Sequence, residues 1–209
     1  MIARNKLHSG IPEISTMPNK ELKTYCPASR QEWRQWLADN HRSEQSVWLV
    51  YYKKNSHKPT VTYQEAVEEA LCFGWIDSTK KTMDEERFMQ LFSRRKAASV
   101  WSRINKEKIR RLMDEGLMTG AGLESIEKAK KNGSWTILDD VEDLKVPEDL
   151  EEAFNNVKGT MDFFLSLSRS DRKAILQWLV LARKVETRQR RISEIVELAA
   201  QKLKPKQFR

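Results

Sequence analysis

Two segments in the first half of the chain have the periodicity of an amphipathic helix. One begins after Ser29, carries three large apolar residues on one face and should end near Asn40. The other begins after Thr62, and Glu65 three residues later completes the spacing of a capping box. Its apolar stripe ends at Gly74, which can close a helix in a left-handed conformation. Both segments are therefore predicted to be helices.

Extended segments lie between and after these two helices. Residues 47–52 are β-branched and aromatic, which favours a strand. Residues 75–83 and 88–92 flank a polar stretch at 84–87, and this arrangement predicts an antiparallel hairpin with a longer turn. The first half of the chain is therefore expected to form a small three-stranded antiparallel sheet with flanking helices.

The chain beyond residue 99 has helical spacing throughout. Its last apolar sets recur every three or four residues, which predicts a helical C-terminal subdomain and a helix-rich α+β fold class. Gly and Pro are frequent and apolar anchors are few near the N-terminus. We therefore divide the chain into a flexible arm at 1–26, an α+β domain at 27–138 and a helical domain at 147–205.

The composition is typical of a folded protein that needs no metal or disulfide framework. Hydrophobic residues make up 39% of its 209 residues, which is enough to build a core. The two cysteines, Cys26 and Cys72, are far apart in sequence, which favours a reducing compartment. No apolar run approaches the ~20 residues that span a bilayer, and the N-terminal residues lack the apolar stretch of a secretion signal. We therefore expect a cytoplasmic protein.

The formal charge of +8 favours anionic partners. Basic residues concentrate at 94–111 and 183–209, whereas residues 139–152 are strongly acidic. An acidic segment between two basic ones can neutralise them within the molecule. Nucleic-acid binding is therefore less favoured than the total charge suggests.

The most unusual local sequence follows Gly74, where Trp75 and Asp77 stand at the expected start of a strand. One interpretation is structural: Trp75 fills the core, and Asp77 caps a turn or pairs with an arginine. The other is functional: Asp77 faces a pocket near Arg94 and Arg95 and accepts hydrogen bonds from a ligand. The sequence leaves both interpretations open.

A second candidate region lies just beyond the hairpin. It gathers arginines, hydroxyl groups, a tryptophan and an amide close to a predicted helix start. Helix N-termini and arginines together bind phosphate or carboxylate groups. The structural alternative is that the hydroxyls and the amide are ordinary helix caps and the tryptophan is core. Taken with those above, the candidate ligand-binding residues are Trp75, Asp77, Arg94, Arg95, Ser99, Trp101 and Asn105.

The sequence contains no recognisable catalytic motif. None of its three histidines stands beside a nucleophile turn, and Cys72 lies on the apolar face of a helix, where thiols usually pack. Glycine-rich phosphate loops are absent, so no cofactor and no metal is expected. A non-enzymatic protein is therefore favoured. An enzyme that uses Asp77 as acid or base on an anionic substrate is the alternative.

Three motifs stand out along the chain: Ala70-Leu-Cys-Phe-Gly-Trp-Ile-Asp-Ser78, Ser99-Val-Trp-Ser-Arg-Ile-Asn105 and Glu186-Thr-Arg-Gln-Arg-Arg-Ile192. Together they resemble the YdeI/OmpD-associated, or bacteriocin-protection, family. The resemblance covers about residues 28–205. The first two motifs look like the family's N-terminal region, and the third lies in what resembles its helical C-terminal domain. Ser93 stands where the family commonly has a proline before the arginine loop.

The resemblance implies a stress-response role in tolerance to bacteriocins or antimicrobial peptides, together with an envelope or porin association. It supplies no catalytic residues. Our hypothesis is a non-enzymatic binding protein that recognises an anionic small molecule or protein partner through Arg94, Arg95, Trp101 and Asn105. A nucleic-acid-binding protein is a further alternative, and its affinity should fall steeply with salt.

Overall fold

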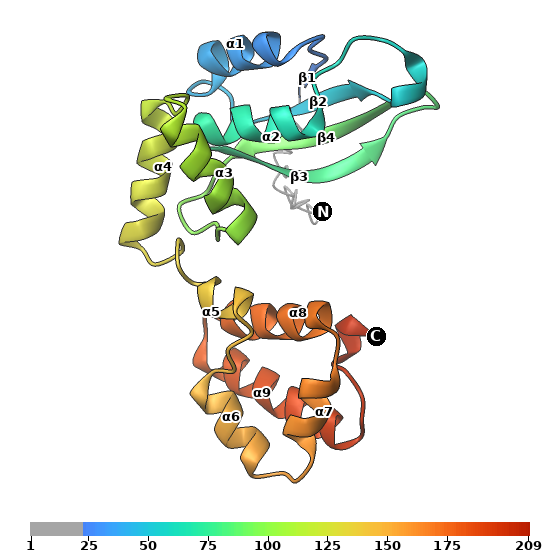
Figure 1. The fold of residues 1–209 in the computed structure, drawn as a ribbon, viewed down its shortest axis with the longest axis vertical. Coiled ribbons are helices and arrows are strands. Elements are labelled where there is room, and N and C mark those ends of the chain that lie inside the picture. The colour runs from blue at the N-terminus through green and yellow to red at the C-terminus, as the bar shows by residue number, and fades with distance from the viewer. Residues whose placement is uncertain (1–22) are drawn as a thin grey trace, which may run out of the picture.

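The computed structural model describes residues 23–209, which form a mixed sheet and a series of helices (Figure 1). The predicted arm at 1–26 lies outside the described residues except for its last four positions. In chain order the elements are β1 (Thr24–Tyr25), α1 (Arg30–Asn40), β2 (Ser46–Tyr52), η1 (Lys54–Ser56), α2 (Tyr63–Cys72), β3 (Trp75–Thr82), β4 (Arg87–Arg94), α3 (Arg103–Asp114), α4 (Gly120–Lys131), α5 (Asp139–Glu142), α6 (Glu148–Asn155), α7 (Thr160–Ser166), α8 (Arg169–Val180), α9 (Val185–Ala200) and η2 (Lys206–Phe208).

The α+β class is confirmed, but the prediction of a three-stranded antiparallel sheet is wrong. The described residues form a four-stranded mixed sheet in the order β1-β2-β4-β3. The hairpin of β3 and β4 is antiparallel, as is the pairing of β2 with β4. The additional strand β1 runs parallel to β2, with Thr24 opposite Trp48 and Tyr25 opposite Leu49. A strand of two residues has no alternation along the sequence, so its pattern could not reveal it.

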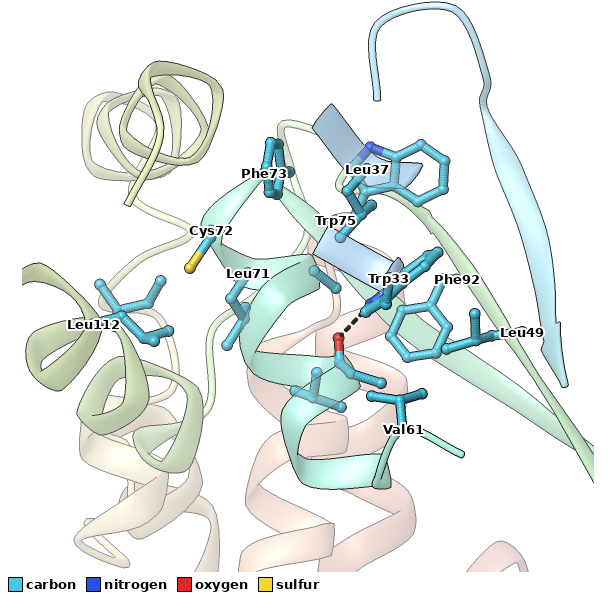
Figure 2. Packing of buried hydrophobic residues seen from close by; sticks show 14 of the residues in the cluster. Trp33, Leu37, Leu49, Val61, Leu71, Cys72, Phe73, Trp75, Phe92 and Leu112 are labelled. Carbon is cyan, nitrogen blue, oxygen red and sulfur yellow. Dashed lines mark hydrogen bonds between the residues drawn. The ribbon is translucent and has the colours of Figure 1, made fainter. Parts of the chain in front are cut away.

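The first hydrophobic cluster lies between the sheet and the helices α1 and α2, which cover the same face of it (Figures 1 and 2). Trp33 of α1 is fully buried there, and its indole nitrogen donates to the carbonyl of Ala66 in α2 at 3.0 Å. Ring contacts extend the cluster from Trp33 to Phe92 of β4, with centroids 5.5 Å apart. These large side chains fix both helices on the sheet.

Local capping explains where the first helices begin and end. Ser29 accepts from the backbone of Glu32 at the start of α1, and Thr62 forms a complete capping box with Glu65 at the start of α2. Gly74 follows α2 with a φ of +72°, the left-handed region that favours glycine. These three predictions from the sequence are confirmed.

The helices α5 to α9 surround a second hydrophobic cluster, which lies apart from the sheet (Figure 1). The sequence predicted a helical domain at 147–205, and α5 lies before its predicted start. Val100, from the loop between β4 and α3, also packs against this second cluster. Within residues 23–209, every helix is too short or too polar to cross a bilayer.

The acidic segment at 139–152 pairs with both basic regions of the chain. Asp143 pairs with Arg103 of α3 at 2.5 Å, and Asp139 pairs with Lys106 one turn further along. Asp149 accepts two hydrogen bonds from the Arg188 guanidinium, at 2.6 and 2.8 Å. Part of the positive charge that the sequence concentrates is therefore neutralised inside the molecule.

Candidate functional site

The loop between β4 and α3 is fixed at both ends. At its start, the backbone N–H of Arg95 donates to the carbonyl of Gly74 at 2.9 Å. At its end, Trp101 is 1% exposed and belongs to the first hydrophobic cluster. Ser102 caps α3, since its hydroxyl accepts from the backbone of Asn105 at 3.3 Å. The loop therefore holds a defined shape beside the N-terminus of α3.

The guanidinium of Arg95 is stacked on the ring of Trp101, with its central carbon 3.6 Å from the ring centroid. Its Nη2 donates to the carbonyl of Val100 at 2.6 Å. The Nε and Nη1 atoms are also buried, but they have no hydrogen-bond partner. Burial lowers the pKa of Arg95 to about 10, although the negative charge of Asp77 acts in the opposite direction. Arg95 is thus a buried cation whose hydrogen bonds and ring contact replace only part of the hydration it has lost.

Arg95 lines a cavity of about 440 Å³ between the sheet, the start of α3 and the helices α5 and α8, which we call the Arg95 cavity. Three of its polar side chains, those of Ser99, Asn105 and Gln177, make no hydrogen bond with any of the described residues. Unpaired donors and acceptors around a partly buried cation are what a polar ligand needs. The full lining is Ile76, Arg95, Ser99, Val100, Ser102, Asn105, Leu138, Glu142, Lys173 and Gln177.

Glu142 and Lys173 form an ion pair at the far wall of the Arg95 cavity, with Nζ and Oε2 2.6 Å apart. Burial raises the pKa of Glu142, but hydrogen bonds from Lys173 and from the Arg103 backbone outweigh this effect and lower it. Glu142 is therefore an anion near neutral pH. With Arg95 and Lys173 against one carboxylate, the charged lining residues sum to one net positive charge.

The other predicted site residues lie elsewhere. Trp75 is fully buried in the first cluster, and its indole nitrogen donates to the carbonyl of His41 at 3.4 Å. Asp77 accepts from the hydroxyl of Tyr63 at 2.8 Å and from the amide of Gln90 at 3.2 Å. The structure therefore places Asp77 on β3 beside a phenol and an amide, and among the described residues Asp77 forms no ion pair with Arg94 or Arg95.

The guanidinium of Arg94 has different hydrogen-bond partners from that of Arg95. Its guanidinium donates to the backbone carbonyls of Arg42 and Glu44, the latter at 3.0 Å. It lines another cavity of about 320 Å³ together with His41, Arg42 and Lys128, and Arg95 borders this cavity as well. The structure thus brings Arg95, Ser99 and Asn105 together around the Arg95 cavity, and it leaves Trp75, Asp77, Arg94 and Trp101 outside its lining.

Sequence reasoning missed Glu142, Lys173 and Gln177, which the helical unit contributes to the Arg95 cavity. The spacing of Lys173 and Gln177 places them on one face of a helix, but nothing in the sequence shows what that face meets. Among residues 23–209, no three His, Cys, Asp or Glu side chains gather as metal ligands would.

Comparison with known protein families divides the chain in two. Residues 25–125 match a domain of unknown function, DUF8412. Residues 143–202 match the family described as "Bacteriocin-protection, YdeI or OmpD-Associated". Searches of curated proteins and of solved structures returned no match. The resemblance noted in the sequence is therefore confirmed for residues 143–202, which are similar to the YdeI/OmpD-associated, bacteriocin-protection family and include the third motif. The first two motifs lie within the part of the chain that matches DUF8412.

Proposed function

We propose that this chain is a non-enzymatic binding protein that acts in tolerance to bacteriocins or antimicrobial peptides and binds an anionic group in the Arg95 cavity. The observation that carries the proposal is the state of Arg95, whose buried Nε and Nη1 donate to no described residue. A buried donor left unpaired costs about 1–3 kcal/mol. A bound carboxylate or phosphate recovers this cost and neutralises the guanidinium charge.

The surroundings of Arg95 support an anion rather than a cation or an apolar molecule. The charged lining residues carry a net positive charge, and Ser99 and Asn105 add free donors. Because the two unpaired nitrogens of Arg95 are closed to solvent, an anion reaches them only when the loop before Trp101 shifts. Binding should therefore change the environment of the Trp101 ring, on which the guanidinium is stacked.

The biological setting of the proposal rests on the family of the helical domain, whose description names bacteriocin protection. We propose the cytoplasm as the compartment. Both cysteines are unpaired, and one of them, Cys26, is exposed, which favours a reducing environment. An association with a porin would then belong to particular members of the family rather than to this chain.

The alternative functions have less support. For nucleic-acid binding, residues on both basic segments are paired with carboxylates of the same chain, as in the Arg103–Asp143 and Arg188–Asp149 pairs. For an enzyme that uses Asp77, the carboxylate already accepts from two side chains and lines none of the cavities described above. The anion-binding function uses groups that the fold leaves free.

Titration of the full chain with inorganic phosphate and with acetate tests the anion site. We expect saturable binding, a change in tryptophan fluorescence, and at least a tenfold weaker affinity for the Arg95→Met variant. Arg110→Met is the matched control, because Arg110 is exposed on α3 and its loss changes the net charge equally. If phosphate and acetate bind wild type and the Arg95→Met variant alike, or bind neither, the Arg95 cavity is not the site.

A survival assay tests the cellular role. A bacterial host that lacks the protein is complemented with the wild-type chain, the Arg95→Met variant or the Arg110→Met variant, and is then exposed to a bacteriocin. We expect the wild-type chain and the Arg110→Met variant to restore survival and the Arg95→Met variant to fail at equal protein level. Equal survival of all strains would contradict the proposed role in bacteriocin tolerance.

A further inference from the structure

One face of α8 lines two cavities in succession. Lys173 and Gln177 border the Arg95 cavity, while Val180 and Leu181 border a second cavity of about 450 Å³. Positions spaced by three or four residues share one face of a helix, so this set forms a continuous wall. Val100 lines both cavities from the opposite side. The two hollows are therefore neighbouring parts of one groove between the α+β unit and the helical unit.

The second cavity, which we call the Ile137 cavity, is mainly apolar. Its walls include Ile137 and Leu181, which are 39% and 37% exposed. Its two uncharged polar side chains are already engaged, since Asn132 and Ser134 both donate to the carbonyl of Ala97, at 2.7 and 3.2 Å. The full lining is Ala98, Val100, Asn132, Gly133, Ser134, Ile137, Val180, Leu181 and Arg183. A fixed wall with free apolar surface suits an apolar group of a ligand.

The charges along this groove favour an anionic occupant. Arg183 is the single charged residue among those that line the Ile137 cavity, and it pairs with no described residue. At the other end, Arg95 and Lys173 exceed Glu142 by one charge. The groove thus has a polar end with a net positive charge at the Arg95 cavity. Its other end, the Ile137 cavity, is apolar except for the positive charge of Arg183.

The two free side-chain amides in the Arg95 cavity narrow the choice of ligand. Asn105 and Gln177 each offer a donor and an acceptor that no described residue uses. A peptide bond presents the complementary acceptor and donor at neighbouring atoms, whereas the carboxylate of a fatty acid only accepts. A main chain is therefore a better match to this end of the groove than an alkyl chain.

Building on the anion site proposed above, we infer that the groove binds the C-terminal end of a peptide or protein. Its terminal carboxylate lies at Arg95, its backbone amides meet Asn105 and Gln177, and an apolar side chain enters the Ile137 cavity. Leu181 follows Gln177 by four positions, a rise of about 6 Å along a helix. An extended chain rises about 3.3 Å per residue, so the apolar side chain belongs about two residues before the C-terminal one.

Four probes test this inference on the full chain by calorimetry. They are the acetylated peptide Gly-Leu-Gly-Gly with a free carboxylate, the same peptide with a C-terminal amide, an all-glycine tetrapeptide acid, and octanoate. We expect the leucine peptide acid to bind at least tenfold more tightly than each of the other three. The Leu181→Asn variant should lose this preference but bind inorganic phosphate as wild type does, because Leu181 does not line the Arg95 cavity.

The outcomes separate the inference from the function on which it rests. If phosphate binds in an Arg95-dependent way but the leucine and all-glycine peptides bind equally, the anion site stands and the peptide groove is wrong. If octanoate binds as tightly as the leucine peptide acid, the groove takes apolar acids and the peptide assignment is wrong. If neither phosphate nor any peptide binds, both proposals fall.

Discussion

The guanidinium of Arg95 lies against the ring of Trp101, 3.6 Å from its centroid, and donates to the carbonyl of the neighbouring residue Val100. Trp101 belongs to the core of the α+β unit, whereas Val100 packs against the core of the helical unit. One charged side chain therefore touches the point where the two cores meet. Stacking on an indole ring compensates only part of the cost of burying a cation, which agrees with the lowered pKa of Arg95.

Replacing Arg95 with methionine separates a binding role from a structural one. Methionine keeps most of the contact with Trp101 and removes the buried unpaired donors. We expect the free energy of unfolding in urea to stay within about 1 kcal/mol of wild type or to rise, because a poorly compensated buried charge is lost. A decrease of more than about 2 kcal/mol would show that Arg95 is retained for folding.

A cluster of ion pairs joins the helices α1, α2 and α3. Unlike Arg95, its buried charged groups are paired with groups of opposite charge. Glu69 of α2 is 2% exposed and accepts from Arg30 and Arg34 of α1, each at 2.6 Å. We expect Glu69→Gln to destabilise the fold by about 3 kcal/mol, near the lower end for a broken buried pair, because both arginines are about one third exposed.

The matched control for this change is Glu124→Gln. Glu124 pairs with Lys128 at 2.7 Å, but both side chains are mostly exposed. An exposed pair contributes at most about 0.5 kcal/mol on a helix. Urea denaturation of both variants gives the comparison, and equal losses would contradict a stabilising role for the buried cluster.

Much of the fold could be predicted because its signals are local. Ser29 and Thr62 mark helix starts through side-chain caps, and Gly74 marks a helix end through its left-handed backbone. The strand β1 could not be predicted in this way. Its two residues are held by pairing with β2 and by the stacking of Tyr25 on Trp36, at 5.7 Å between ring centroids. Such contacts are between residues that are distant in sequence, and no short-range pattern records them.

The candidate site shows the same division. The segment that carries Arg95, Ser99 and Asn105, which runs from the loop into the start of α3, could be identified from its residue types. The different partners of Arg94 and Arg95 could not be predicted, because they depend on backbone carbonyls just after α1 that accept hydrogen bonds from the Arg94 guanidinium. The contribution of Lys173 depends on how the helical unit packs on the loop, which local periodicity does not determine.

The two cysteines should react very differently with thiol reagents. Cys26 is exposed, whereas Cys72 is fully buried, and burial raises the pKa of its thiol to about 11, helped by the negative charge of Glu69. Since the thiolate is the reactive form, Cys72 should stay inert below that pH in the folded protein. We expect a disulfide reagent at pH 8 to titrate one thiol in the native state and two after unfolding in urea. Two fast-reacting thiols in the native state would contradict this burial.

Two glycines in α4 predict opposite responses to alanine. A Cβ on Gly122 would lie 2.3 Å from the carbonyl oxygen of Cys72, whereas a Cβ on Gly120 would have no neighbour within 4 Å. The Cys72 carbonyl cannot easily withdraw, because it accepts from both the backbone and the hydroxyl of Thr119, at 3.2 and 2.7 Å.

We therefore expect Gly122→Ala to push α4 away from the end of α2 and to lower the free energy of unfolding by about 1–3 kcal/mol. Gly120→Ala should be neutral or stabilise the protein by up to about 1 kcal/mol. Alanine has a higher helix propensity than glycine, and it lowers the conformational entropy of the unfolded chain. Urea denaturation of the two variants side by side measures the difference. Because both changes add one methyl group to the same helix, equal stabilities would mean that α4 does not approach α2 this closely.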